Sequence, residues 1–229
     1  MSKTMPIVVE KTNQGERSYD LASRLMQDRI ITIDSDVTEN LAHIVGQQLV
    51  YLDSLNSEDI TLYLNSPGGS CHDGMKIQDM MDLCRSDIVI IGTGQLCSMG
   101  CYLLSKGTPG KRFLTKRAQV MAHQASSGTQ GHVADQIASL EHTKYLNELL
   151  CNEIADAVGK PIAGYMKDVV RDFWMNAEEA VMYGKKGFAD GIYDGKRDSN
   201  GDLVVITRAD LKKKNAASTK AKNAETVEE

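Results

Sequence analysis

Two copies of one pattern stand next to each other in this chain: a short apolar strand, a glycine-containing turn and a helix. The first copy has Ile-Thr-Leu-Tyr-Leu at 60–64 before Asn-Ser-Pro-Gly-Gly at 65–69. The second has Asp-Ile-Val-Ile-Ile at 87–91 before Gly-Thr-Gly at 92–94. Strands joined through a helix pair in parallel, because the crossover needs a dozen or more residues. The sequence therefore predicts an α/β fold.

Helical and strand patterns continue on both sides of these units. Asp36 followed by Glu39 resembles a capping box, and apolar residues recur at helical spacing over 37–56. Residues 118–122 are typical of a further strand, and a long helical pattern covers 132–159. A helix of that length leaving a compact α/β core is expected to serve assembly.

The C-terminal part has weaker patterns. Asn176 with Glu179 indicates another helix cap, and Asn200-Gly201 marks a hairpin turn. From Arg208 onward the apolar pattern stops, and lysines stand among Ala, Asn, Ser and Thr. We expect a disordered, solvated tail there rather than a nucleic-acid-binding arm.

Composition narrows the function classes. With 229 residues the chain is long enough for one large domain, and its net charge of −5 argues against bulk attraction to nucleic acid or anionic lipid. The five cysteines are odd in number and include no Cys-x-x-Cys pair, which favours reduced thiols and a cytoplasmic location. We find no signal peptide and no apolar run of about 18 residues, so no membrane association is expected.

The turns after the parallel strands are where a ligand site is expected, since ligands gather beyond the carboxyl ends of such strands. Ser98 lies there and opens a helix, so it is either a nucleophile near helix amides or simply an N-cap. Gly68 is either a backbone donor beside it or part of a tight turn. Neither turn has a complete phosphate-binding glycine motif, which disfavours nucleotide binding.

A nucleophilic serine needs a base, and the chain offers five histidines. They are His43, His72, His123, His132 and His142. His123 ends the predicted 118–122 strand, where active groups of parallel sheets belong, and Asp172 precedes an apolar Phe-Trp-Met run. A histidine at a strand end is more often structural, so the residues by themselves leave the triad open.

Six segments, in this order, resemble the proteolytic subunits of the Clp protease family. They are Gly-Glu-Arg-Ser-Tyr-Asp at 15–20, Asn-Ser-Pro-Gly-Gly at 65–69, Gly-Gln-Leu-Cys-Ser-Met-Gly at 94–100, Gly-Lys-Arg-Phe at 110–113, Met-Ala-His-Gln at 121–124 and Arg-Asp at 171–172. The likeness runs from about 6 to 192. It implies a crotonase-like α/β fold of repeated β-β-α units with a protruding handle helix at about 132–159.

The resemblance also divides the chain and assigns roles. It implies an axial N-terminal segment at 1–16, a peptidase domain at 17–194, and a C-terminal hairpin with a disordered charged tail at 195–229. The site residues that it implies are Ser98 as nucleophile, His123 as general base and acid, Asp172 as the residue that orients the imidazole, Gly68 and Met99 as oxyanion-hole amides, and Arg171 as the link between assembly and catalysis. A thiol mechanism through Cys97 is disfavoured, because serine fills the nucleophile position.

The implied function is a serine endopeptidase of ATP-dependent proteolysis and protein quality control. Two stacked heptameric rings, a tetradecamer, would enclose the sites, and an AAA+ unfoldase of the ClpX, ClpA or ClpC type would deliver unfolded polypeptides. ATP would be used by that partner, so neither a cofactor nor a metal is expected in this chain. A catalytically idle ring-building subunit and a crotonase-like acyl-CoA enzyme remain as alternatives.

Several positions depart from the family pattern. Thr61 replaces an aromatic residue of the unfoldase-docking pocket, and Ala125 replaces the proline that usually follows His-Gln. Leu96 and Cys97 replace two small residues, and residues 185–187 resemble an insertion. These departures put docking affinity and cleavage preference in doubt and indicate a divergent member.

Overall fold

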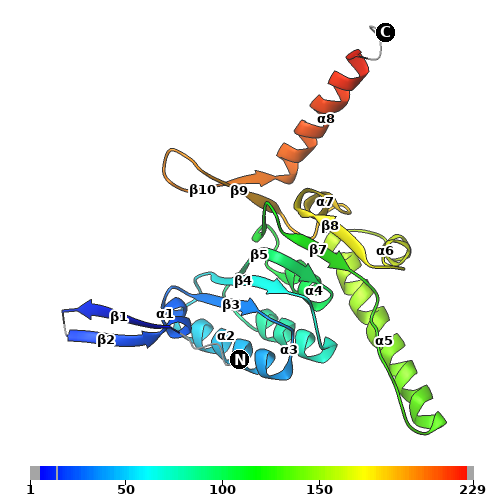
Figure 1. The fold of residues 1–229 in the computed structure, drawn as a ribbon, viewed down its shortest axis with the longest axis horizontal. Helices are drawn as coiled ribbons and strands as arrows, with labels where there is room; N and C mark the ends of the chain where they lie inside the picture. Colours follow the sequence, from blue (N-terminus) through cyan, green and yellow to red (C-terminus); the bar gives the residue numbers. More distant parts are fainter. Residues whose placement is uncertain (1–5, 14, 226–229) are drawn as a thin grey trace.

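The computed structural model describes residues 6–13 and 15–225, in which strands and helices alternate (Figure 1). The strands are β1 (Ile7–Thr12), β2 (Gly15–Asp20), β3 (Ile30–Asp34), β4 (Ile60–Ser66), β5 (Ile88–Cys97), β6 (Arg112–Thr115), β7 (Gln119–Ala122), β8 (Phe173–Asn176), β9 (Gly191–Arg197) and β10 (Leu203–Thr207). The helices are α1 (Leu21–Gln27), α2 (Glu39–Leu55), α3 (Cys71–Asp82), α4 (Met99–Lys106), α5 (Val133–Val158), α6 (Ile162–Asp168), α7 (Ala177–Met182) and α8 (Arg208–Glu225).

Eight of the strands form one sheet with the order β10-β9-β6-β5-β4-β3, and β7 and β8 continue from β5. The pairs β3–β4, β4–β5, β5–β6 and β6–β9 are parallel, whereas β9–β10 and β7–β8 are antiparallel. Helices α2 and α3 cover one face of the sheet (Figure 1). The predicted α/β class with parallel strand–turn–helix units is confirmed.

Strand β5 is longer than the sequence pattern indicated, because the expected turn at 92–94 lies inside it. Its first part, Ile90 to Gly92, pairs with β6, and its last part, Gln95 to Cys97, pairs with β7. Gly94 has a φ of +55° at this change of partner, which glycine adopts at little cost. A bend within β5 thus lets this strand pair with two neighbouring strands, β6 and then β7, before α4 begins.

The apolar faces predicted for the helices do form the core. In α2, the buried residues Ala42, Val45, Leu49 and Leu52 recur at helical spacing and pack into the main cluster. The expected cap at Asp36 is wrong, since Thr38 is the N-cap and its hydroxyl accepts from the Leu41 amide. Val37, which lies between Asp36 and that cap, instead pairs with Gly69 in a parallel bridge, so the helix begins after it.

The other predicted cap is confirmed. The Asn176 side chain accepts from the Glu179 amide at 3.0 Å, and the Glu179 carboxylate accepts from the Asn176 amide at 2.8 Å. This reciprocal pair starts α7 directly after β8.

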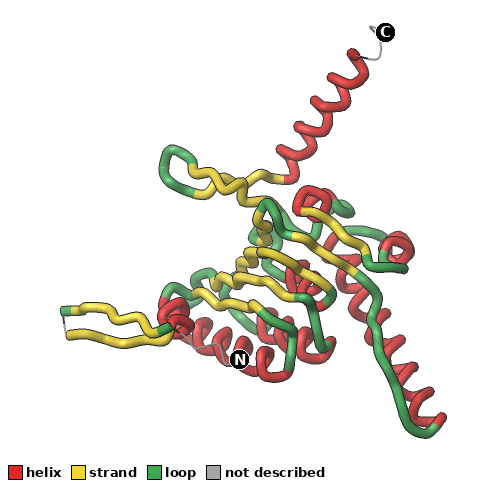
Figure 2. Tube along the Cα trace, viewed as in Figure 1, coloured by secondary structure: helices red, strands yellow, loops and turns green. Residues whose placement is uncertain are grey.

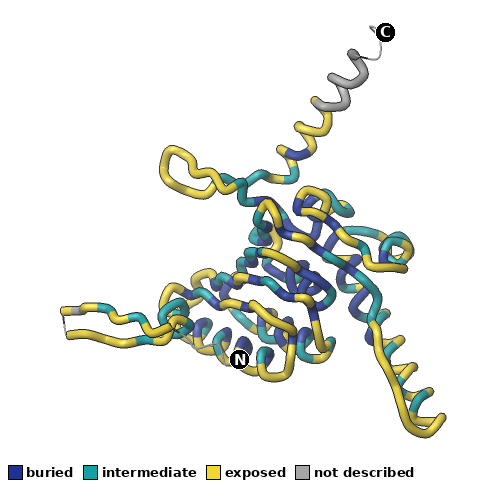
Figure 3. Tube along the Cα trace, in the orientation of Figure 1, coloured by how far each residue is buried: buried dark blue, intermediate teal, exposed yellow. Residues whose placement is uncertain are grey.

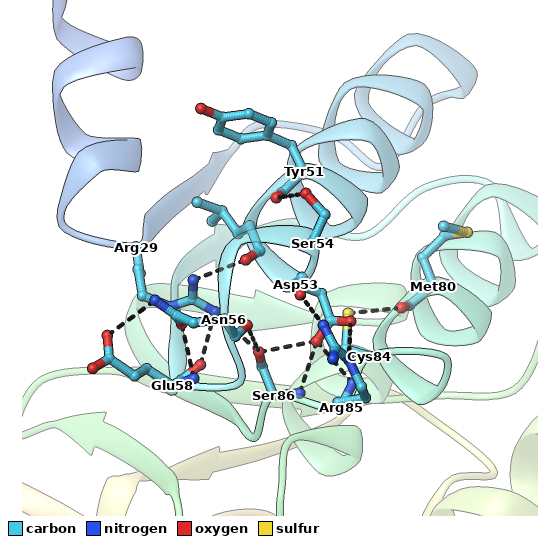
Figure 4. A network of polar contacts seen from close by, with 11 residues as sticks. Arg29, Tyr51, Asp53, Ser54, Asn56, Glu58, Met80, Cys84, Arg85 and Ser86 are labelled. Atoms are coloured by element: carbon cyan, nitrogen blue, oxygen red, sulfur yellow. Dashed lines mark hydrogen bonds and ion pairs between the residues drawn. The ribbon is translucent and has the colours of Figure 1, made fainter.

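A polar network fastens the amino ends of β3 and β5 to the end of α2 (Figure 4). The buried Arg29 guanidinium donates to the Leu52 carbonyl at 2.8 Å and to Ser86 Oγ at 3.0 Å. Ser86 in turn donates its amide and hydroxyl to Asp53 Oδ1 at 2.9 and 3.0 Å. These bonds satisfy groups that burial would otherwise leave unpaired.

Three segments project from the body of the molecule: the β1–β2 hairpin, helix α5, and the β9–β10 hairpin with α8 (Figure 2). The β1–β2 hairpin, the loop end of the β9–β10 hairpin and the far end of α5 are largely exposed (Figure 3). The long helix predicted at 132–159 is thus present as α5, and the predicted hairpin turn lies between β9 and β10.

The tail predicted to be disordered from Arg208 onward is instead helical in the described residues. Leu211 is buried in the core, and Arg208 donates to main-chain carbonyls at the end of α7. Leu211, Arg208 and an ion pair of 2.7 Å between Lys214 and Glu178 therefore hold the first turns of a segment whose own composition favours disorder.

Candidate active site

Ser98 stands between β5 and α4 in a backbone conformation that non-glycine residues rarely adopt. Its φ is 53° and its ψ is −118°, and it occupies the N-cap position without a side-chain capping bond. Such a conformation costs about 1–3 kcal/mol and recurs at functional sites, notably at nucleophilic serines on strand-to-helix turns. The interpretation of Ser98 as a simple helix cap is therefore not supported, because its hydroxyl does not cap α4.

The glycine turn after β4 lies against Ser98. A Cβ added to Gly68 would be 2.6 Å from the Ser98 Cβ and 3.1 Å from the Met99 nitrogen, and Gly68 has a φ of +100°. Only glycine fits such a contact. The structure thus brings together the nucleophile candidate and the two residues predicted to supply oxyanion-hole amides.

The Gly68 amide is already hydrogen bonded in this structure. It donates to Ser66 Oγ at 3.1 Å, and Ser66 is fully buried at the end of β4. Met99 is the first residue of α4, where helix amides have no acceptor within the helix. An oxyanion between the two amides would compete with Ser66 for the Gly68 donor.

His123 and Asp172 lie side by side because of strand pairing. In the antiparallel β7–β8 ladder Ala122 is opposite Phe173, so His123 and Asp172 are the next residues outward on adjacent strands. Both line a surface cavity of about 490 Å³. The other residues that line it are Gln124, Val169, Val170, Arg171 and Trp174.

Ser98 joins this pair through β7. Its neighbour Cys97 is paired in parallel with Met121, and the Ser98 amide donates to the Met121 carbonyl at 2.9 Å. The three strand ends that carry Ser98, His123 and Asp172 are therefore adjacent. Within the described part of the chain, no hydrogen bond joins the three side chains. Catalytic hydrogen bonds are often long in free enzymes and tighten around substrate.

Cys97 is buried beside the predicted nucleophile. Burial raises the pKa of its thiol, and the negative charge of Asp172 raises it further. A thiol that stays protonated is a poor nucleophile, which weighs against a thiol mechanism. The same effect indicates that the Asp172 carboxylate lies within electrostatic reach of the end of β5.

Two residues near the site were missed by the sequence reasoning. Trp174 is exposed and lines the cavity with His123, while Ser66 holds the Gly68 amide. The sequence could have indicated Trp174, because it stands on a short strand close to Asp172 and the side chains of a strand alternate between its two faces. Ser66 had no such signal, because its contact depends on the turn geometry.

Arg171 and the histidines His72 and His142, which the sequence also singled out, make fewer contacts with the site. Arg171 lines the cavity but forms no ion pair among the residues that the structure describes. His72 and His142 contact each other, and His72 lines a different cavity from that of His123.

In the described ranges no group of three or more His, Cys, Asp or Glu side chains gathers to hold a metal ion. None of the helices in those ranges is long and apolar enough to cross a bilayer.

Fold and site together define a class of protein. A strained serine opens a helix at the carboxyl end of a parallel strand, with a close-packed glycine turn beside it and a histidine and an aspartate on neighbouring strand ends. This arrangement is the one expected of a serine hydrolase on an α/β fold.

Comparison with known proteins gives the family. The family model described as Clp protease matches residues 13–196. The ATP-dependent Clp protease proteolytic subunits of Streptococcus pyogenes serotype M5 (strain Manfredo), serotype M49 (strain NZ131) and serotype M1 are each 43% identical over 193 residues, which cover 83% of this chain and 97% of each relative. The chain belongs to the Clp protease family, and it is a serine-type endopeptidase that hydrolyses peptide bonds.

Proposed function

We propose that Ser98, His123 and Asp172 form the catalytic triad of this peptidase. His123 takes the proton of Ser98 Oγ as that oxygen bonds to the peptide carbonyl carbon. It then passes the proton to the departing amine as the C–N bond breaks. Water, deprotonated by the same imidazole, then bonds to the acyl carbon, the C–O bond to Ser98 breaks, and His123 returns the proton to Ser98 Oγ. The observation that carries this proposal is the strained backbone of Ser98 beside the Gly68 turn.

In the same proposal Gly68 and Met99 stabilise the oxyanion, and Asp172 orients the imidazole. The contact of Gly68 with Ser98 supports this role, as does the place of Met99 at the start of α4. The Gly68 amide would exchange its bond to Ser66 for one to the oxyanion. Arg171 would act as a positioning residue that couples assembly to the neighbouring Asp172.

We infer a wider setting from the family. The relatives are named as subunits of an ATP-dependent protease, so this chain would work in the cytoplasm with an AAA+ unfoldase of the ClpX, ClpA or ClpC type. That partner would use ATP, and the chain itself would need no cofactor. Two stacked heptamers would enclose the sites, and the exposed part of α5 is suited to contacts between rings. Unfolded polypeptides would be the substrates.

A fluorophosphonate probe tests the triad. The intact chain should be labelled once, at Ser98, and should hydrolyse a short fluorogenic peptide. Ser98→Ala should lose both properties, while the matched variant Cys97→Ala should keep the labelling. An assembled, folded chain that is neither labelled nor active would instead support the idle ring-building subunit, and tight binding of coenzyme A would support the acyl-CoA alternative.

A second experiment tests the assembly. Native mass measurement should give a tetradecamer, and an unfoldase with ATP should be required for hydrolysis of a folded protein but not of the short peptide. A stable monomer with full peptidase activity would contradict the enclosed chamber while leaving the triad intact.

A further inference from the structure

A pair of histidines outside the peptidase site joins two helices that are far apart in the sequence. His72 lies in the first turn of α3, and His142 lies within α5. Their Nε2 atoms are 3.3 Å apart, the ring centroids are 5.5 Å apart, and the ring planes differ by 17°. Both side chains are exposed, and neither takes part in the proposed triad.

The separation of these nitrogens suits a shared metal ion. Zinc binds imidazole nitrogen at about 2.0–2.1 Å in tetrahedral sites, which places two such nitrogens about 3.3–3.4 Å apart. The two Nε2 atoms are already at that spacing, on two helices rather than on loops. An ion could therefore bind between them without movement of the backbone, and sites built on helices hold their geometry best.

The surroundings favour a cation. A cavity of about 500 Å³ lies between α3 and α5, with His72 on its wall. Three carboxylates line it, those of Asp79, Asp82 and Glu153, against the two ammonium groups of Lys76 and Lys106. Lys106 and Glu153 are 2.7 Å apart and neutralise each other, which leaves Asp79 and Asp82 against Lys76. The Tyr145 ring, one turn further along α5, stacks on His142 with centroids 6.2 Å apart.

We propose that His72 and His142 form a two-histidine clamp for a divalent transition-metal ion of the Zn²⁺, Ni²⁺ or Cu²⁺ class. Imidazole suits these ions, whereas Mg²⁺ and Ca²⁺ prefer oxygen ligands. No third His, Cys, Asp or Glu joins the pair within the described residues, so water completes the coordination. The ion would fasten α5 to α3 across 70 positions of sequence.

The clamp has a thermodynamic consequence for the chain. The two nitrogens meet only in the folded chain, because His72 and His142 lie 70 positions apart in the sequence, so the ion binds the native state in preference to the unfolded state. Metal binding of that kind raises the free energy of unfolding by mass action. Added Zn²⁺ should therefore raise the melting temperature of the wild-type chain.

Zn²⁺ titration of the full chain without a histidine tag, followed by calorimetry, tests the proposal. The wild type should bind one Zn²⁺ per chain at this site. Since loss of outer partners alone weakens metal sites by about 10–100-fold, His72→Gln and His142→Gln should each weaken binding by at least about tenfold. The matched variant His132→Gln, on an exposed histidine at the start of α5, should bind as the wild type does.

Two further measurements separate this site from the others. His123→Gln should keep the Zn²⁺ affinity if the ion lies at the clamp. Bound Cu²⁺ should show coupling to two imidazole nitrogens by electron paramagnetic resonance in the wild type and to fewer in His142→Gln. The proposal is overturned if the wild type binds no Zn²⁺, if both clamp variants bind as tightly as the wild type, or if binding is lost only in His123→Gln.

Discussion

Gly68 lies so close to Ser98 that a Cβ on the glycine would be 2.6 Å from the Cβ of the serine. The two residues come from different strand–turn–helix units, the turn after β4 and the start of α4. The Gly68 turn and the strained serine are thus packed directly against each other, with no room for a side chain between them.

Gly68→Ala should abolish most of the peptidase activity. The new methyl group would displace either Ser98 or the main chain at Cys97, because it would lie 2.8 Å from the Cys97 carbonyl oxygen. Since loss of one oxyanion donor costs about 10²–10³ in rate, we expect a fall of at least about a hundredfold in kcat. Gly128→Ala is the control, because nothing lies within 4 Å of a Cβ there. Equal activity of the two variants would contradict the contact.

Replacement of Ser98 should separate stability from activity. Ser98→Gly and Ser98→Ala should both be inactive, since each lacks the hydroxyl. The glycine variant should nevertheless be more stable than the alanine variant by about 1 kcal/mol, because glycine tolerates a φ of 53°. Urea unfolding of the two purified chains measures the difference. An alanine variant as stable as the glycine variant would show that the backbone at this position is not strained.

The ionisation of Asp53 should make the free energy of unfolding depend on pH. Hydrogen bonds to its carboxylate, above all from the Ser86 amide, lower the pKa of Asp53 to about 2. A folded-state pKa below the unfolded value stabilises the native state above the unfolded pKa, and the contribution is lost as pH falls toward the folded value. We therefore expect the stability gap between wild type and Asp53→Asn to be largest above about pH 4 and to shrink toward about pH 2.

Unfolding curves between pH 2 and 7 measure this gap. Asp36→Asn serves as the control, because Asp36 is exposed and its carboxylate accepts no hydrogen bond in the described chain. A gap for Asp53→Asn that stays constant over the whole range would refute the linkage.

Arg208 should anchor the C-terminal helix. Its guanidinium donates to the carbonyls of Val181 at 2.6 Å and Met182 at 3.1 Å, at the end of α7. Arg208→Ala leaves those carbonyls unsatisfied, so the free energy of unfolding should fall by about 1–3 kcal/mol. Lys212→Ala, an exposed position in the same helix, should change it by less than about 0.5 kcal/mol. Chemical denaturation compares the two, and matching values would mean that α8 is not held by Arg208.

Local patterns in the sequence were enough to predict several elements of the fold. The strand–turn–helix unit of β4 and α3, the strand and helix of the next unit without its expected turn at 92–94, the long helix that is α5, the Asn176 cap and the hairpin at Asn200-Gly201 all depend on residues that are near one another in the chain. The triad roles came from the order of the family motifs and stay predictions, because no observation yet tests which side chains react.

Tertiary structure decided what depends on partners distant in sequence. The bend of β5 between two neighbouring strands, the helical state of the tail, the contact of Gly68 with Ser98 and the meeting of His72 with His142 could not be inferred from periodicity. Periodicity reports which face of an element is apolar, but it does not report which element covers that face. Packing between segments supplies that information: contacts of Arg208 and Leu211 hold the start of α8 against the body, although the composition of this segment favours disorder.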